Sequence, residues 1–172
     1  SFFKKMYTAQ ETKYIVTHSG NFHLDEVLAV FMIRQLPVFQ NHELIRSRKP
    51  EDFAKADIIV DVGAKFNVDK RQFDHHQKSF NEFFHADPEK QITKLSSAGL
   101  IFKYYGKQLI PIMLKDTVLS SEQVDELYLK IYKDFIEAVD ANDNGVFAYL
   151  RDVVPSYNNF GLSLASLVSN NN

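Results

Sequence analysis

Several common features are missing from this sequence of 172 residues, and each absence excludes a class of protein or site. The chain has no cysteine, which rules out disulfides and thiolate metal sites. No apolar run approaches the roughly 20 residues of a membrane-spanning helix, so we expect no membrane partner. The net charge is −2, so no global basic field attracts nucleic acid. A polyanionic substrate would therefore have to be held locally or through a metal.

Apolar residues, in contrast, are plentiful. They make up 45% of the chain and include 15 Phe and 8 Tyr, which suits a packed core and excludes a disordered protein. The length favours one domain. We expect residues 1–13 to be a flexible N-terminal segment and residues 14–172 to form the domain.

The order of the expected elements predicts an α/β fold with a mostly parallel sheet flanked by helices. Apolar runs bounded by Gly or polar residues indicate strands at 14–17, 42–48, 56–63 and, more weakly, 71–74. The third run is continuously apolar and is typical of a strand buried on both faces. Helical patterns cover residues 24–36, 96–110 and 120–145, and a last short helix falls within 158–172.

Helix ends are marked by polar residues. Ser96 or Ser97 is expected to cap the second helix, and Ser120 or Ser121 the third. The third helix carries apolar residues at Val124, Leu127, Ile131, Phe135, Ile136 and Val139, and Gly145 closes the turn after it.

Histidines and acids stand at the ends of the expected strands and helices. The stretch "RQFDHHQKSF" places His75 and His76 after one strand, His18 follows the first strand, and Asp61 ends the most apolar one. Because carboxyl ends of parallel strands converge on one crevice, three separate segments should aim ligands at one place.

The residue types favour a pair of metal ions. Imidazole and carboxylate without thiolate suit Mn²⁺, Fe²⁺ or Co²⁺, with Mg²⁺ and Zn²⁺ less distinctive. Six ligands exceed what one catalytic metal takes from protein, and they fit two metals that share Asp61 as a bridge. Two such ions about 4 Å apart suit in-line attack on phosphorus. The six candidates are His18, His23, Asp25, Asp61, His75 and Asp140.

Some assignments stay open at this point. His23 could cap the helix that contains Asp25, and Glu26 reads most simply as a first-turn helix acid. Asp140 and Asp143 share one helix face, and Asp143 could be structural or could join Asp140 at the metals.

Five motifs give the chain a specific resemblance. In order along the chain they are "THSGNFHLDEVLA", "DIIVDVGAKF", "RQFDHHQKSF", "TKLSSAGLIFKYYG" and "FIEAVDANDNG". They are similar to the melanocyte-proliferating-gene-one exonuclease family, within the DHH phosphoesterase superfamily. Family members are about twice this length, so the chain resembles their N-terminal catalytic half. A second domain, absent here, is expected to close over the site.

The resemblance implies a 3′-to-5′ exonuclease acting on RNA or short oligonucleotides, with two Mn²⁺ ions preferred and Mg²⁺ or Co²⁺ possible. It places the same six residues at the metals. It implies that His76 faces the phosphoryl group and assists the leaving oxygen, while Asp74 orients a histidine. An intracellular location is implied, with nucleus, mitochondrion and cytoplasm left open.

Substrate contacts are expected from two stretches. Ser96, Ser97 and Gly99 could bring a phosphate to the N–H groups that begin a helix, beside their simpler role as its cap. Arg46 and Arg48 form a short basic run that could contact nucleic acid or simply be solvated.

Two other functions are compatible with the same residues. One is a small-molecule phosphatase or pyrophosphatase, because the site would recognise phosphate and not base, and the near-neutral charge favours it. The other is a non-catalytic module with structural metals or none.

Overall fold

The computed structural model describes residues 11–146 and 164–172, so most of the segment expected to be flexible lies outside the described residues. Five strands form one sheet in the order β2-β1-β3-β5-β4. The pairs β1/β2, β1/β3 and β3/β5 are parallel, which confirms the mostly parallel sheet. The strands are β1 (Tyr14–Thr17), β2 (Glu43–Arg46), β3 (Ala56–Val60), β4 (Phe66–Asn67) and β5 (Gln72–Phe73).

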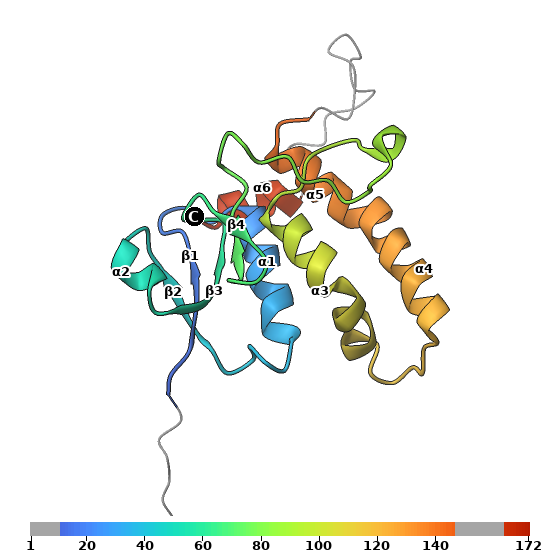
Figure 1. Cartoon of the computed structure of the whole chain (residues 1–172), viewed down its shortest axis with the longest axis horizontal. Coiled ribbons are helices and arrows are strands. Elements are labelled where there is room, and N and C mark those ends of the chain that lie inside the picture. Colours follow the sequence, from blue (N-terminus) through green and yellow to red (C-terminus); the bar gives the residue numbers. More distant parts are fainter. Residues whose placement is uncertain (1–10, 147–163) are drawn as a thin grey trace, which may run out of the picture.

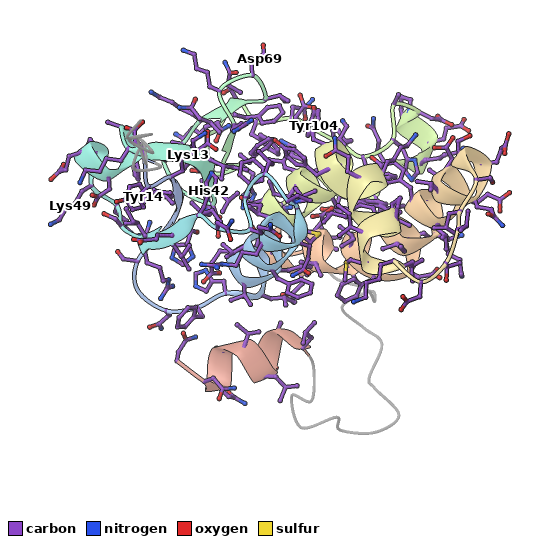
Figure 2. The ribbon with its side chains drawn as sticks, turned by 90° about the horizontal axis from the view of Figure 1, so that it is seen from below. Lys13, Tyr14, His42, Lys49, Asp69 and Tyr104 are labelled. Atoms are coloured by element: carbon purple, nitrogen blue, oxygen red, sulfur yellow. The ribbon has the colours of Figure 1, made fainter. Side chains whose placement is uncertain are left out.

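The edge strand β4 is absent from the sequence prediction. It pairs antiparallel with β5, with Phe66 opposite Phe73. Two residues are too few to show an alternating pattern, which is why the sequence does not reveal it. Tyr104 of helix α3 (Ser97–Met113), labelled in Figure 2, packs against both rings, with centroids 6.0 and 6.1 Å away. The short strand is therefore fixed by aromatic packing.

Helices cover the sheet as expected. Figure 1 shows α1 between the sheet and α3, with α4 outermost. Among the described residues, no helix has the length and apolar character needed to cross a membrane. The helices are α1 (Leu24–Gln35), α2 (Pro50–Phe53), the 3₁₀ turn η1 (Pro88–Lys90), α3 (Ser97–Met113), α4 (Ser121–Ile131), the π-helical turn η2 (Tyr132–Ile136), α5 (Glu137–Asp143) and α6 (Leu164–Asn170).

Strand β3 is buried on both faces, as its continuous apolar run predicts. Ile58 and Val60 belong to the main core, which the sheet shares with α1, α3 and α5. Ile59 points to the other face and joins Val16 in a smaller cluster, against which Phe53 of α2 packs. The central strand is thus anchored from two sides, and its carboxyl end is held in place.

The helix caps resolve the alternatives that the sequence left open. Ser96 caps α3, because its Oγ accepts a hydrogen bond from the Gly99 N–H at 3.4 Å. Ser120 caps α4 in the same way, accepting from the Gln123 N–H at 3.2 Å. Gly145 has a φ of +69°, so it closes the turn after α5 as expected.

A π-helical turn interrupts the long helix between α4 and α5. The Glu137 N–H donates to the Tyr132 carbonyl, five residues earlier. This wide turn changes which residues face inward: Tyr132 and Ile136 are buried, whereas Phe135 is 41% exposed. Such turns are frequent near functional sites, and this one sets the direction in which α5 presents its acids.

The packing of α3 on α4 generates a stability prediction. A Cβ at Gly106 would lie 2.9 Å from Cε2 of Tyr128, whose hydroxyl is held by the Lys103 carbonyl at 2.7 Å. Helix propensity alone would make Gly106→Ala stabilising by about 1 kcal/mol. We expect the overlap to reverse the sign and to lower the free energy of unfolding by about 1–3 kcal/mol.

Urea denaturation measures this change, and Gln108→Ala, at an exposed position of the same helix, is the matched control. A Gly106→Ala protein as stable as the control would contradict the close approach.

Candidate metal centre

The carboxyl ends of three parallel strands meet at one rim, as the sequence predicts. His18 follows β1, Asp61 follows β3, and His75 follows β5. The two oxygens of Asp61 reach in opposite directions: Oδ2 lies 3.5 Å from Nε2 of His18, and Oδ1 lies 3.5 Å from Nε2 of His75. Residues 57 positions apart in the chain therefore face the same carboxylate.

The converging atoms are buried and lack ordinary partners. Nε2 of His18, Oδ1 of Asp61 and Nε2 of His75 are all out of contact with solvent, and none makes a hydrogen bond. Buried polar atoms are normally hydrogen-bonded. Divalent cations held on the two sides of Asp61 would satisfy these atoms.

The tautomer of His18 fits this role. Its Nδ1 lies 3.1 Å from the Ser19 carbonyl oxygen, which can only accept a hydrogen bond. Nδ1 therefore carries the proton and donates it, so Nε2 presents its lone pair to the centre. This is the usual arrangement of a metal-binding histidine.

Candidate ligand atoms fall into three overlapping groups, in each of which they lie within 4.8 Å of one another. Asp61 belongs to two of them, and His75 also belongs to two. Among the described residues, these clusters could therefore bind metal ions. The groups are His18, His23, Glu26 and Asp61; Asp61, His75 and His76; and Asp25, His75 and Asp143.

Asp140, expected at the metals, has its carboxylate elsewhere. It is fully buried, and its Oδ1 accepts hydrogen bonds from the Ser96 N–H at 2.9 Å and the Ser96 hydroxyl at 2.7 Å. Its Oδ2 accepts from the Tyr132 hydroxyl at 3.0 Å. Burial raises the pKa of Asp140 to about 7. These contacts saturate the carboxylate, and it stands outside the three groups.

Asp143 takes the position that the sequence assigned to Asp140. One turn further along α5, its Oδ2 lies 3.1 Å from Nε2 of His75. Both acids share a helix face, as the three-residue spacing predicts. Their depths differ, because Asp140 packs under α3 whereas Asp143 reaches the rim. One feature of the sequence distinguishes the two acids: Asp143 is nearer the end of its helix, where a side chain reaches the rim more easily.

Glu26 is a second residue that the sequence analysis did not place at the centre. It is 1% exposed, and its Oε2 lies 3.4 Å from Nε2 of His18. The same oxygen accepts from the His23 N–H at 2.7 Å, so Glu26 also serves the start of α1 as a first-turn acid. His23 is the N-cap residue, and its ring lies 5.1 Å from that of His18. Both residues combine a capping position with a place in the first group.

The N-terminus of α3 is bound by an acid of the chain itself. Ser97 N–H and Ala98 N–H donate to the two oxygens of Asp25 at 3.0 and 2.6 Å. Ser96 and Ser97 have no exposed surface. At Gly99, a Cβ would lie 2.2 Å from Oδ1 of Asp140, so the glycine is required by a carboxylate of the chain itself. The expected phosphate contacts of this stretch are thus replaced by side chains of α1 and α5.

Asp74 holds His76 and the loop beside it. Its Oδ1 lies 2.6 Å from Nδ1 of His76, and its Oδ2 accepts from the Ala64 N–H at 2.6 Å. Asp74 is 2% exposed, whereas the His76 side chain is 61% exposed. A buried carboxylate therefore orients a histidine that faces outward.

The two arginines of the basic run behave differently. Arg46 lies over the Phe22 ring, with Cζ 3.7 Å from its centroid, and its Nη2 is 3.4 Å from Oε1 of Glu26. It is therefore engaged with the chain. Arg48 lines a cavity of about 450 Å³ together with His18, Asp61 and His76. Of the two, Arg48 is the one placed to meet a bound anion.

Asp61 has a strained backbone. Its φ is +56°, in the left-handed region that residues other than Gly rarely adopt. This conformation turns the chain sharply after β3 and directs the carboxylate to the rim. Strain of this kind persists at functional sites when the surrounding structure enforces it.

The charges at the centre are unbalanced in favour of anions. Contact with Asp61 and Glu26 raises the pKa of His18 to about 10. Burial lowers the pKa of His75, but surrounding carboxylates, the strongest of them Asp143, outweigh this and raise it to about 12. Burial also opposes ionisation of Asp61, yet the two histidines hold its pKa at about 2. The carboxylates thus bind cations strongly, and the donor set fits divalent metals.

Comparison with known proteins agrees with this picture. The model of the MYG1 exonuclease family, described as uncharacterised protein family UPF0160, matches residues 14–172. The chain belongs to this family. It is 48% identical over 165 residues to the MYG1 protein of Saccharomyces cerevisiae, an alignment that covers 94% of this chain and 47% of that protein. With the MYG1 exonuclease of Mus musculus it shares 45% identity over 134 residues, or 77% of this chain and 35% of the relative.

The MYG1 protein of Schizosaccharomyces pombe gives similar values, 45% over 155 residues, covering 90% of this chain and 46% of that protein. The chain thus spans about half the length of the curated relatives it matches. No solved structure matches it.

In the absence of metal, the ion pairs of His18 are expected to make the free energy of unfolding depend on pH. The raised pKa of His18 adds stability that is complete below the ordinary histidine value of 6.5 and disappears as pH rises towards 10. In chelator, the free energy of unfolding should therefore fall as the pH rises between these values. His18→Gln should reduce this slope, as measured by urea denaturation at several pH values. An unchanged slope would contradict the pairing.

The two acids of α5 give opposite predictions. Asp143→Ala is expected to weaken Mn²⁺ binding at least about tenfold, because it removes a candidate ligand, and to change stability little. Asp140→Ala should leave Mn²⁺ stoichiometry unchanged and lower the free energy of unfolding by about 2–4 kcal/mol, because Ser96 and Tyr132 lose a buried acceptor. Calorimetric titration and thermal denaturation measure the two effects. Loss of metal binding in Asp140→Ala alone would reverse the assignment.

Proposed function

We propose that this chain is the catalytic half of a metal-dependent phosphodiester hydrolase of the DHH phosphoesterase type, and that the whole protein is a 3′-to-5′ RNA exonuclease. The observation that carries the proposal is that His18 Nε2 and His75 Nε2, both buried and without hydrogen bonds, lie on the two sides of the Asp61 carboxylate, whose Oδ1 is also buried and unpaired. The exonuclease name of the mammalian relatives supports the reaction class.

The acidic rim makes the activity depend on metal. Asp25, Glu26, Asp61 and Asp143 surround the place where a phosphate would react, so an anion is repelled unless cations are bound first. His18, His23, Glu26 and Asp61 would hold one ion, and Asp61, His75, Asp25 and Asp143 the other. Bound divalent ions supply Lewis acidity towards the phosphate and lower the pKa of water. Mn²⁺ is the ion we expect, with Mg²⁺ or Co²⁺ as substitutes.

His76 is the residue of this chain that we assign to proton transfer. Asp74 occupies its Nδ1, and Nε2 is the ring nitrogen left for substrate. Hydrolysis joins the oxygen of water to phosphorus and breaks the bond from phosphorus to the 3′ oxygen of the preceding nucleotide. His76 gives that leaving oxygen its proton, and the proton lost by water passes to solvent. The nearby carboxylate of Asp74 raises the pKa of His76, which favours the protonated form needed for this step.

We expect substrate binding to involve a part of the protein outside this chain. Arg46 is occupied by Glu26 and Phe22, which leaves Arg48 as the arginine of the basic run nearest the centre. We therefore propose that a second domain closes over the rim and contacts the RNA backbone. The nucleus, mitochondrion or cytoplasm would each suit such an enzyme.

A small-molecule phosphatase is the second candidate. The net charge of −2 and the internal engagement of Arg46 favour it, since long RNA is normally bound by a field of free basic residues. The two candidates share the centre and differ only in what is attached to the phosphate.

Activity assays separate these candidates. With Mn²⁺, the full-length protein is expected to shorten a 5′-labelled RNA stepwise from its 3′ end. His76→Ala should lower kcat by about 10²–10⁴-fold, because it removes the group assigned to proton transfer. Asp61→Ala should abolish both activity and tight Mn²⁺ binding.

His85→Ala, which changes a histidine outside the three groups, is the matched control and should keep activity. Hydrolysis of pyrophosphate or mononucleotides without any shortening of RNA would favour the phosphatase. Full activity of Asp61→Ala would rule out both the exonuclease and the phosphatase at this site.

A further inference from the structure

Two cavities flank the candidate metal centre, and His23 lines both. One, of about 450 Å³, contains His76 and is called here the His76 cavity. The other, of about 300 Å³, is called the Phe22 cavity. Asp25 and Asp143 form part of its wall, so it borders the third group of candidate ligands.

Phe22 is an unusual residue at this place. It is 42% exposed, although it stands beside charged groups and outside the core clusters of the described residues. The guanidinium of Arg46 covers one face of the ring at 3.7 Å. Phe22 lines the cavity, whereas Arg46 is not among its lining residues.

The ring is held in this position from two directions. Arg46 is itself fixed by Glu26, which binds it at 3.4 Å. On the other side, the Asn172 side chain donates to the Phe22 carbonyl at 2.8 Å and accepts from its N–H. Helix α6, which precedes Asn172, lies beside the start of α1 and provides Ala165 and Ser169 to the cavity wall (Figure 2).

The walls of the Phe22 cavity select a flat, weakly polar ligand. Phe22, Val139 and Ala165 are apolar, and Asn142 and Ser169 offer hydrogen bonds at the edge. The acids at the inner end would repel an anion unless metals were bound. A group attached to a metal-held phosphate, with apolar faces and polar edges, meets these conditions. A nucleobase is such a group, and bases stack on aromatic rings with little dependence on sequence.

We propose that the Phe22 cavity binds the base of the 3′-terminal nucleotide, stacked on the Phe22 ring. This assignment rests on the proposed function. His76 is assigned there to the leaving oxygen, which belongs to the preceding nucleotide, so the rest of the strand lies on the side of the His76 cavity. The nucleotide that is released lies on the other side of the phosphate, where Phe22 is.

Binding of an uncleavable RNA tests the assignment without relying on turnover. The probe carries 2-aminopurine at its 3′ end and a methylenephosphonate in its last linkage, and a second probe has an abasic residue at the same end. With the full-length protein and Mn²⁺, stacking should quench the fluorescence of the first probe. Phe22→Ala should restore the fluorescence and weaken binding about tenfold. The abasic probe should bind Phe22→Ala and wild type equally.

Phe22→Tyr keeps an aromatic face and should retain both quenching and affinity. Phe31→Ala removes a similarly exposed phenylalanine, 47% exposed on α1 and outside the cavity wall, and should change nothing. Equal weakening of both probes by Phe22→Ala would overturn the stacking role, since it would indicate an effect on His23. Wild type that binds Mn²⁺ but neither probe would contradict the proposed function itself.

Discussion

The arrangement of the rim depends on two buried carboxylates bound at the N-terminus of α3. Asp25 accepts from the first two N–H groups of the helix, and Asp140 accepts from the Ser96 cap. Burying a carboxylate costs several kcal/mol unless hydrogen bonds and a favourable dipole compensate, and a helix N-terminus supplies both. The two contacts tie α1 and α5 to α3. As a result Glu26, next to Asp25, and Asp143, one turn beyond Asp140, reach the same space as the strand ends.

The parts of this site that sequence reasoning recovered are those controlled by chain direction. His18, Asp61 and His75 each follow a strand, and the strands are parallel, so their meeting is a consequence of topology alone. The choice between Asp140 and Asp143 was not recoverable in this way. It depends on how deeply each turn of α5 packs under α3, and the π turn that sets this leaves no recognisable pattern in the sequence. The strand β4 was missed because it has only two residues.

Glu26 illustrates a different limit. A first-turn acid and a buried ligand candidate have the same position in the sequence, and in this structure one side chain has both roles. The distinction depends on its burial, which follows from Arg46 and His18 lying against it. Local sequence rules identify Glu26 as a first-turn helix acid, whereas its role as a candidate ligand arises from tertiary packing. The net charge of −2 does not reveal the centre for a related reason, since the acids of the candidate groups are concentrated within a few ångströms of one another.

The position of Asp61 has a further consequence for how the centre fills. Its two oxygens face different histidines, so each side of the carboxylate is held by a separate strand end. A cation held by one oxygen would share its carboxylate with a partner on the other side, so the two sides of the rim would not bind independently.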